Sequence, residues 1–260
     1  MLQYAYLIDN CLTNGNMVTG RNGKTKQIIG AMLKWKVYSN KMLIPKGRQL
    51  YLDGVKGELA ALVRGPKWVK DFKLWGCNYW DQFADKRGRL KLDYGNAWLY
   101  GGVNQIERIV EALNNRSQAR DLMIVGWRPN RIKELTLPCC HFAYQFLLEK
   151  DKLYLVWYQR SADIMVGIPS DIVLAQLMLI SMAAETDLKP TGVVMHLGSA
   201  HIYDIHLPIA PTILAEEYKV KKLYTDYVAH RGLTFSWFDP SNISINYPNN
   251  LEKYKLVCVR

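Results

Sequence analysis

The feature that most constrains the fold is residues 172–185, a stretch that is apolar on nearly every side of a helix. Such a helix has to be surrounded by other elements, because no face of it suits water. Short apolar runs rich in strand-forming residues lie before and after it, at 122–127, 153–158 and 193–195. We therefore predict a buried helix that packs against a sheet.

The remaining elements favour a mixed architecture. Residues 103–114 carry apolar side chains at helical spacing, and 55–65 also reads as a helix. Residues 13–24 are rich in glycine and asparagine, and we expect a flexible loop there. Strands and helices do not alternate regularly, and no linker divides the chain. This pattern predicts a single α+β domain over 1–260, with a large mixed β-sheet flanked by helices.

Length and charge limit the class of protein. The 260 residues are enough for one domain with a substantial core. We see no secretion signal or membrane-spanning run, so we expect a cytoplasmic protein. The net charge of +11 suits a polyanion, either a nucleic acid or a phosphorylated small substrate. The basic residues are scattered, however, and a solvated surface explains most of them.

Cys140 is the candidate nucleophile, and Arg160 follows it by twenty residues in a predicted strand. A thiol reacts as the thiolate, and a nearby cation favours that form. The simpler alternative is that Cys139 and Cys140 are buried apolar side chains. The five cysteines are odd in number and form no CxxC pair, so we expect neither a disulfide framework nor a metal site.

A cysteine protease is the obvious rival, because the chain also holds candidate histidine bases. These are His141, His196, His201 and His206. His141 is a poor base for Cys140, since neighbouring residues of a strand point to opposite faces.

A series of motifs, in order from about residue 20 to 206, resembles the thymidylate synthase family. In order they are Arg21, Gly57-Glu58-Leu59, 79–85 with Trp80, Asp93-Tyr94-Gly95, Cys139-Cys140-His141 with Gln145-Phe146, Gln159-Arg160-Ser161 with Asp163, Gly167-Ile168-Pro169-Ser170-Asp171, and His201-Ile202-Tyr203 with His206. Cys139 stands where the family has a proline. The resemblance implies the family fold and transfer of a one-carbon unit from 5,10-methylenetetrahydrofolate to C5 of a pyrimidine nucleotide.

The resemblance also implies roles for individual residues. Cys140 would bond to C6 of the base, Glu58 would move protons through water, Tyr94 would help to remove the C5 proton, and Arg160 would lower the pKa of Cys140. Arg21, Arg160, Gln159 and Ser161 would bind the nucleotide and its phosphate, and His201 and Tyr203 the sugar. Trp80, Asp163 and Gly167 would contact the folate. Without the resemblance, Glu58 reads as a surface charge, Trp80 and Tyr94 as core aromatics, and Arg160 as structural.

The family is dimeric, and each subunit donates two adjacent arginines to the phosphate in the other. Here Arg120 fits the first position, and Asp121 stands at the second. The resemblance therefore implies a homodimer with Arg120 donated across the interface. Lys24 or Arg116 are the candidates to replace the second cation.

Asp171 indicates which pyrimidine base the substrate carries. The family has asparagine at this place, which reads the O4 acceptor and N3–H donor of uracil. A carboxyl group instead accepts from the N4 amine of cytosine, as in the deoxycytidylate (dCMP) hydroxymethylase branch. The alternative is that Asp171 or Ser170 only caps a helix that starts near Ile172.

The product is less constrained. Hydroxymethylation needs water to attack an exocyclic methylene, whereas methylation needs a hydride in a dry site. The charged last residue, Arg260, favours conversion of dCMP to 5-hydroxymethyl-dCMP, and His141 leaves methylation of dCMP or dUMP open. A nucleotide- or RNA-binding protein without catalysis is the non-enzyme alternative. A virus that modifies its DNA in the host cytoplasm is the setting that this branch implies.

Overall fold

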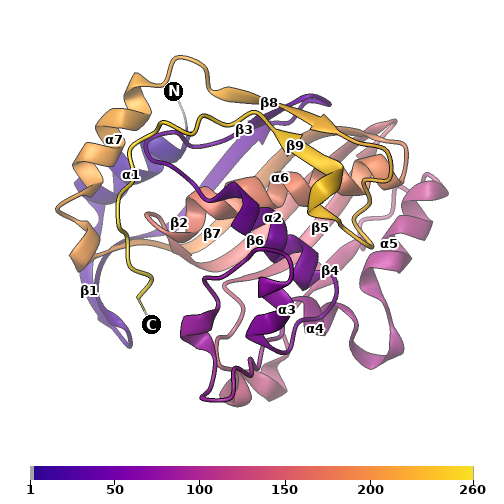
Figure 1. Cartoon of the computed structure of the whole chain (residues 1–260), viewed down its shortest axis with the longest axis horizontal. Coiled ribbons are helices and arrows are strands. Elements are labelled where there is room, and N and C mark those ends of the chain that lie inside the picture. Colours follow the sequence, from indigo (N-terminus) through magenta and orange to yellow (C-terminus); the bar gives the residue numbers. More distant parts are fainter. Residues whose placement is uncertain (1–2, 260) are drawn as a thin grey trace.

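A six-stranded sheet with the order β1-β2-β7-β6-β5-β4 forms the frame of the protein in this computed structural model, which describes residues 3–259 (Figure 1). Its strands are β1 (Asn16–Gly20), β2 (Gly23–Lys36), β4 (Met123–Val125), β5 (His141–Glu149), β6 (Lys152–Asp163) and β7 (Lys189–Tyr203). Only β6 and β7 pair in parallel, and the other neighbours are antiparallel. The predicted α+β class with a large mixed sheet is confirmed.

The parallel pair β6 and β7 is joined by α6 (Gly167–Glu185), because parallel neighbours need a crossover connection. α6 packs against both strands on one side and against α2 (Leu52–Leu62) on the other (Figure 1). It has the length and apolarity of a membrane span, but 78% of that stretch is buried inside the protein. The prediction of a buried helix against a sheet is therefore confirmed.

The start of α6 corrects one expectation about Asp171. The helix begins at Gly167, and Val166 occupies the position that precedes its first turn. Asp171 therefore lies inside the helix, so the alternative that it merely caps a helix starting near Ile172 is wrong. The helix can begin before Pro169, because proline is compatible with the first turn of a helix.

The predicted loop at 13–24 is also wrong. After α1 (Gln3–Asn14) the chain forms the hairpin of β1 and β2, with Arg21 and Asn22 in its turn. Gly23 has a φ of 120°, which a residue with a side chain rarely adopts. Pairing of β2 with β7 over most of its length overrides the local preference for a loop.

The other elements surround this frame. They are α3 (Val69–Lys73), α4 (Tyr94–Trp98), α5 (Gln105–Asn114), α7 (Ala210–Lys219), and a small sheet of β3 (Lys41–Leu43), β8 (Tyr224–Ala229) and β9 (Ile243–Ile245). The helices predicted at 55–65 and 103–114 are present as α2 and α5. Asn104 caps α5 by accepting hydrogen bonds from the main-chain N–H groups of Ile106 and Glu107.

Candidate active site

Cys140 lies directly before β5 and beside β6, as expected. The main-chain N–H of Arg160 donates to the carbonyl of Cys140 at 2.9 Å. The Arg160 guanidinium donates to the carbonyls of Cys139 and Pro138, both at 2.9 Å. Burial raises the pKa of the Cys140 thiol, while the hydrogen bond with Tyr94 and the charge of Arg160 act in the opposite direction. The cation is therefore in place, but burial outweighs its effect on the thiol.

Tyr94 contacts the nucleophile through the main chain. Its hydroxyl accepts a hydrogen bond from the main-chain N–H of Cys140 at 2.9 Å. Tyr94 is the first residue of α4, and the next residue, Gly95, lies against α2. A Cβ at Gly95 would come within 1.6 Å of the Leu62 carbonyl oxygen, so only glycine permits this approach.

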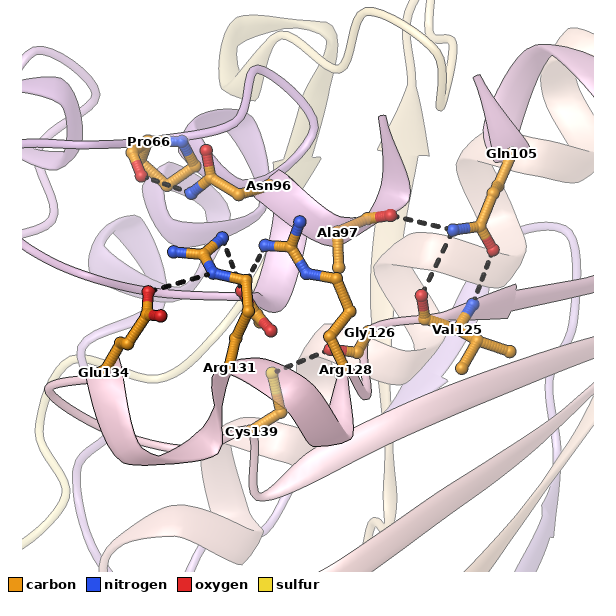
Figure 2. Close-up of polar contacts among 11 residues, drawn as sticks. Pro66, Asn96, Ala97, Gln105, Val125, Gly126, Arg128, Arg131, Glu134 and Cys139 are labelled. Atoms are coloured by element: carbon orange, nitrogen blue, oxygen red, sulfur yellow. Dashed lines mark hydrogen bonds and ion pairs between the residues drawn. The ribbon is translucent and has the colours of Figure 1, made fainter. Parts of the chain in front are cut away.

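The short helix α4 is held in place by polar contacts that the sequence reading missed. Asp93, directly before Tyr94, is fully buried and forms ion pairs with Arg128 and, at 3.3 Å, with Arg131. Figure 2 shows the side chains of Arg128 and Arg131 next to each other, with Glu134 beside Arg131. Gln105 also bridges the carbonyl of Ala97 to the main chain of β4 (Figure 2). The one available signal was the position of Asp93 next to a candidate catalytic residue.

Glu58 is buried inside α2, so its reading as a surface charge is wrong. Tyr79 donates from its hydroxyl to one carboxylate oxygen at 2.6 Å, and the indole N–H of Trp80 donates to the other at 2.9 Å. Burial raises the pKa of Glu58 to about 7, and these two hydrogen bonds oppose the rise. A carboxyl group with a pKa near neutrality suits a general base.

Trp80 packs among aromatic rings of its own chain. Its ring stacks on Phe72 with centroids 4.9 Å apart, and Tyr94 meets it edge-on at 5.6 Å. Only 5% of Trp80 is exposed. Its predicted contact with folate stays a prediction, and its observed partner is Glu58.

Asp171 is held from β6 by Gln159. The side-chain N–H of Gln159 donates to Asp171 at 2.9 Å, and Trp157 donates its indole N–H to the Gln159 carbonyl oxygen at 2.8 Å. The second contact fixes which end of the amide faces Asp171. Burial raises the pKa of Asp171 to about 8, and the charges of Glu58 and Asp163 add to the rise. Gln159, predicted as a nucleotide ligand, therefore supports Asp171 in this structure.

Asp163 and Gly167 lie at the turn from β6 into α6. One carboxylate oxygen of Asp163 accepts from the main-chain N–H groups of Met165 and Val166, at 2.9 and 3.1 Å. A Cβ on Gly167 would lie 3.6 Å from an Asp171 oxygen and 3.8 Å from the Asp163 Cβ. Both distances are ordinary van der Waals contacts, and the predicted contact of Asp163 and Gly167 with the folate stays a prediction.

A cavity of about 400 Å³ opens at the outer end of this region. Five predicted nucleotide ligands line it, from the β1–β2 hairpin, β6 and β7. They are Arg21, Arg160, Ser161, His201 and Tyr203. The lining also includes residues that were not predicted, namely Trp127, Gln27 and Ser199. Cys140, Glu58, Tyr94, Gln159, Asp163, Gly167 and Asp171 do not line this cavity.

Arg120 is separated from the cavity within one chain. It is exposed, and its carbonyl accepts from Gln145 at 2.7 Å. Asp121 pairs with Arg108 at 3.4 Å, so it does not act as a free negative charge. Arg116 donates to the Thr186 carbonyl at 2.8 Å, at the end of α6. Of the two candidates for the second cation, only Lys24, on the β1–β2 hairpin, lies near Arg21.

The histidines do not form a protease pair with the cysteine. Burial lowers the pKa of His141 to about 3, and its ring contacts the Tyr144 hydroxyl. Across residues 3–259, no hydrogen bond joins the Cys140 sulfur to a histidine. Within the same residues no group of three or more His, Cys, Asp or Glu side chains is placed to hold a metal ion.

These observations define a class of protein. A mixed sheet supports a cysteine beside an arginine, a buried and a half-buried carboxyl group with raised pKa values, and a cavity with two arginines. This set suits covalent group transfer to an anionic substrate. Residues 2–250 match the family model described as thymidylate synthase, and the chain belongs to the thymidylate synthase family. The family supports folate-dependent transfer of a one-carbon unit to C5 of a pyrimidine nucleotide.

Proposed function

We propose that this protein converts dCMP into 5-hydroxymethyl-dCMP with 5,10-methylenetetrahydrofolate as the one-carbon donor. The observation that carries the proposal is the half-buried Asp171 carboxyl group, held by Gln159 at 2.9 Å where the family has asparagine. The product suits a virus that modifies its own DNA in the host cytoplasm.

The chemistry of Asp171 favours cytosine. Its raised pKa of about 8 makes it a neutral acid at pH 7, with one O–H donor and one acceptor oxygen. It then donates to N3 of cytosine and accepts from the N4 amine. Neutral Asp171 can also donate to O4 of uracil and accept from its N3–H, but O4 is a much weaker proton acceptor than N3 of cytosine. When ionised, Asp171 meets an acceptor in either base, so the preference for cytosine lies in the proton shared with N3.

The reaction begins at Cys140. Its thiolate bonds to C6 of the base, and the electron pair of the C5–C6 bond moves to C5. Bound folate supplies the carbon that C5 attacks. That carbon has two bonds to folate nitrogens: one would break as C5 bonds to it, and the other as the C5 proton leaves, which would release tetrahydrofolate. The C5 proton then leaves on the side of Tyr94, which yields an exocyclic methylene.

Water completes the product. Glu58 takes a proton from water as the oxygen bonds to the methylene carbon, and the electron pair returns to expel Cys140 from C6. A general base with a pKa near 7 is half ionised at neutral pH, which suits this step. The balance is one dCMP, one methylenetetrahydrofolate and one water for one 5-hydroxymethyl-dCMP and one tetrahydrofolate.

The cavity would hold the rest of the nucleotide. We assign the phosphate to Arg21, Arg160 and Ser161, and the sugar to His201 and Tyr203, all of which line it. The folate would lie toward Asp163, Gly167 and Trp80. A homodimer would add Arg120 from the second subunit. Exposed Ile29 (76%) and Met32 (58%) on β2 support a subunit contact on that face of the sheet.

The test incubates the purified protein with dCMP, CMP or dUMP and methylenetetrahydrofolate, and reads products by mass. We expect a hydroxymethyl product from dCMP whose oxygen carries the label when the water contains heavy oxygen. Cys140→Ser should abolish it. A methyl product would show that the reaction is methylation and not hydroxymethylation. A preference for dUMP would overturn the proposed role of Asp171. Salt-dependent RNA binding without turnover would favour the non-enzyme alternative.

A further inference from the structure

Tyr79 has no role so far, and it contacts Glu58, the proposed general base, directly. Its hydroxyl lies 2.6 Å from one Glu58 oxygen and 3.3 Å from the carbonyl of Gly54, one turn earlier on α2. Tyr79 therefore contacts both the carboxylate and the helix that carries it. Trp80 holds the other oxygen, so consecutive residues occupy both ends of the group.

Two glycines make this arrangement possible. A Cβ on Gly57 would lie 2.1 Å from the carbonyl oxygen of Trp75, and one on Gly54 would lie 3.1 Å from the Tyr79 ring. The close approach of α2 to the segment after α3 therefore depends on Gly54 and Gly57. It places Tyr79 where its hydroxyl reaches Glu58 with little freedom to move.

The groups around Glu58 make the hydrogen bonds from Tyr79 and Trp80 important for its charge. Cys77 and Tyr79 face it from the segment after α3, Asp171 from α6, and Tyr144 from β5. None of these four groups is a cation. Burial and Glu58 hold the pKa of Tyr79 well above its ordinary value, so Tyr79 stays a donor throughout the working pH range.

We propose that Tyr79 is a positioning residue for Glu58: its hydroxyl bond fixes one carboxylate oxygen and stabilises the ionised form that accepts the proton from attacking water. This inference rests on the proposed function. Each carboxylate oxygen has two lone pairs, so Tyr79 and Trp80 leave one on each for water. Without the Tyr79 donor, less hydrogen bonding opposes the effect of burial, and the pKa of Glu58 rises further.

The variant Tyr79→Phe removes one oxygen and keeps the ring. We expect kcat at pH 7 to fall about tenfold with KM for dCMP unchanged. The acidic limb of the kcat profile should move up by about 1–2 pH units, since a hydrogen bond to a charged group is about 1.5–3 kcal/mol. A purely structural role would not move this limb.

Tyr51→Phe is the matched control. Its hydroxyl donates to the Gly76 carbonyl at 2.8 Å, between the same two segments, and does not contact Glu58. We expect a wild-type pH profile from this variant. Equal profiles for Tyr79→Phe and wild type would overturn the inference.

A second measurement separates this inference from the proposed function. Infrared titration of the Glu58 carboxyl without substrate, identified by its loss in Glu58→Gln, reports its pKa directly. We expect a higher midpoint in Tyr79→Phe than in wild type. If wild type turns over no pyrimidine nucleotide, the proposed function fails. An unchanged midpoint overturns the assignment of Tyr79, whatever the reaction.

Discussion

At the residue scale, burial changes the chemistry of the two carboxyl groups. Glu58 and Asp171 look like ordinary acids in the sequence, with pKa values of about 4 expected in water. The fold shields them from most of the water and raises their pKa values to about 7 and about 8. The sequence identified both residues, but not their state, because a pKa depends on contacts between distant segments.

The raised pKa of Asp171 predicts how recognition of cytosine depends on pH. Its pKa is raised, so the group is neutral below about pH 8 and ionised above it. Ionisation removes the O–H that donates to N3 of cytosine. The kcat/KM for dCMP should therefore fall between pH 7 and pH 9.

The control for this prediction is Asp171→Asn, whose amide does not titrate. It should shift preference toward dUMP about tenfold or more, since one well-made base contact discriminates by about 1–3 kcal/mol. Its kcat/KM for dUMP should not fall over the same pH range. A fall of equal size in the asparagine variant would mean that another group causes the pH dependence.

At the element scale, the contacts between elements decide where the catalytic groups lie. The helical periodicity at 55–65 and 103–114 predicted α2 and α5, because an amphipathic pattern is local. The hairpin at 16–36 was missed, because its strands are stabilised by pairing with β7. The role of Asp93 was missed for the same reason, since its arginines lie more than thirty residues away.

Removal of the Asp93 charge should destabilise α4 and the residues beside it. Asp93→Asn leaves Arg128, which is 12% exposed at its side chain, without its carboxylate. Breaking a buried pair in this way costs about 3–5 kcal/mol of unfolding free energy. Urea denaturation measures the loss.

Glu134→Gln is the matched control, because Glu134 is 63% exposed and pairs with Arg131 at 3.6 Å. Exposed pairs contribute about 0–1 kcal/mol, so this variant should unfold like wild type. Equal stability of wild type and Asp93→Asn would show that the buried pairs do not hold α4.

At the scale of the whole molecule, one chain supplies only part of the proposed phosphate site. Arg21 and Arg160 line the cavity, whereas Arg120 is exposed and lies outside it. The net charge of +11 suits an anionic substrate but does not say where it binds. A second subunit is the simplest source of a further cation.

Mixing a weakened variant with an inactive one tests the dimer. Arg120→Ala should raise KM for dCMP by about tenfold or more, because a charge-assisted hydrogen bond to phosphate is lost. Unfolded and refolded together, Arg120→Ala and Cys140→Ser should recover activity through mixed dimers that hold one complete site. Activity no greater than that of Arg120→Ala alone would place Arg120 in its own subunit's site, or in none.

The sequence by itself determined the types of the main elements, the buried helix, the pairing of Cys140 with the strand of Arg160, and the family. These follow from local periodicity and from motif order. Only the tertiary structure decided that Asp171 lies inside α6, that Gln159 holds it, and that Tyr79 and Trp80 hold Glu58. Those facts depend on burial and on contacts between distant segments, and a linear pattern contains neither.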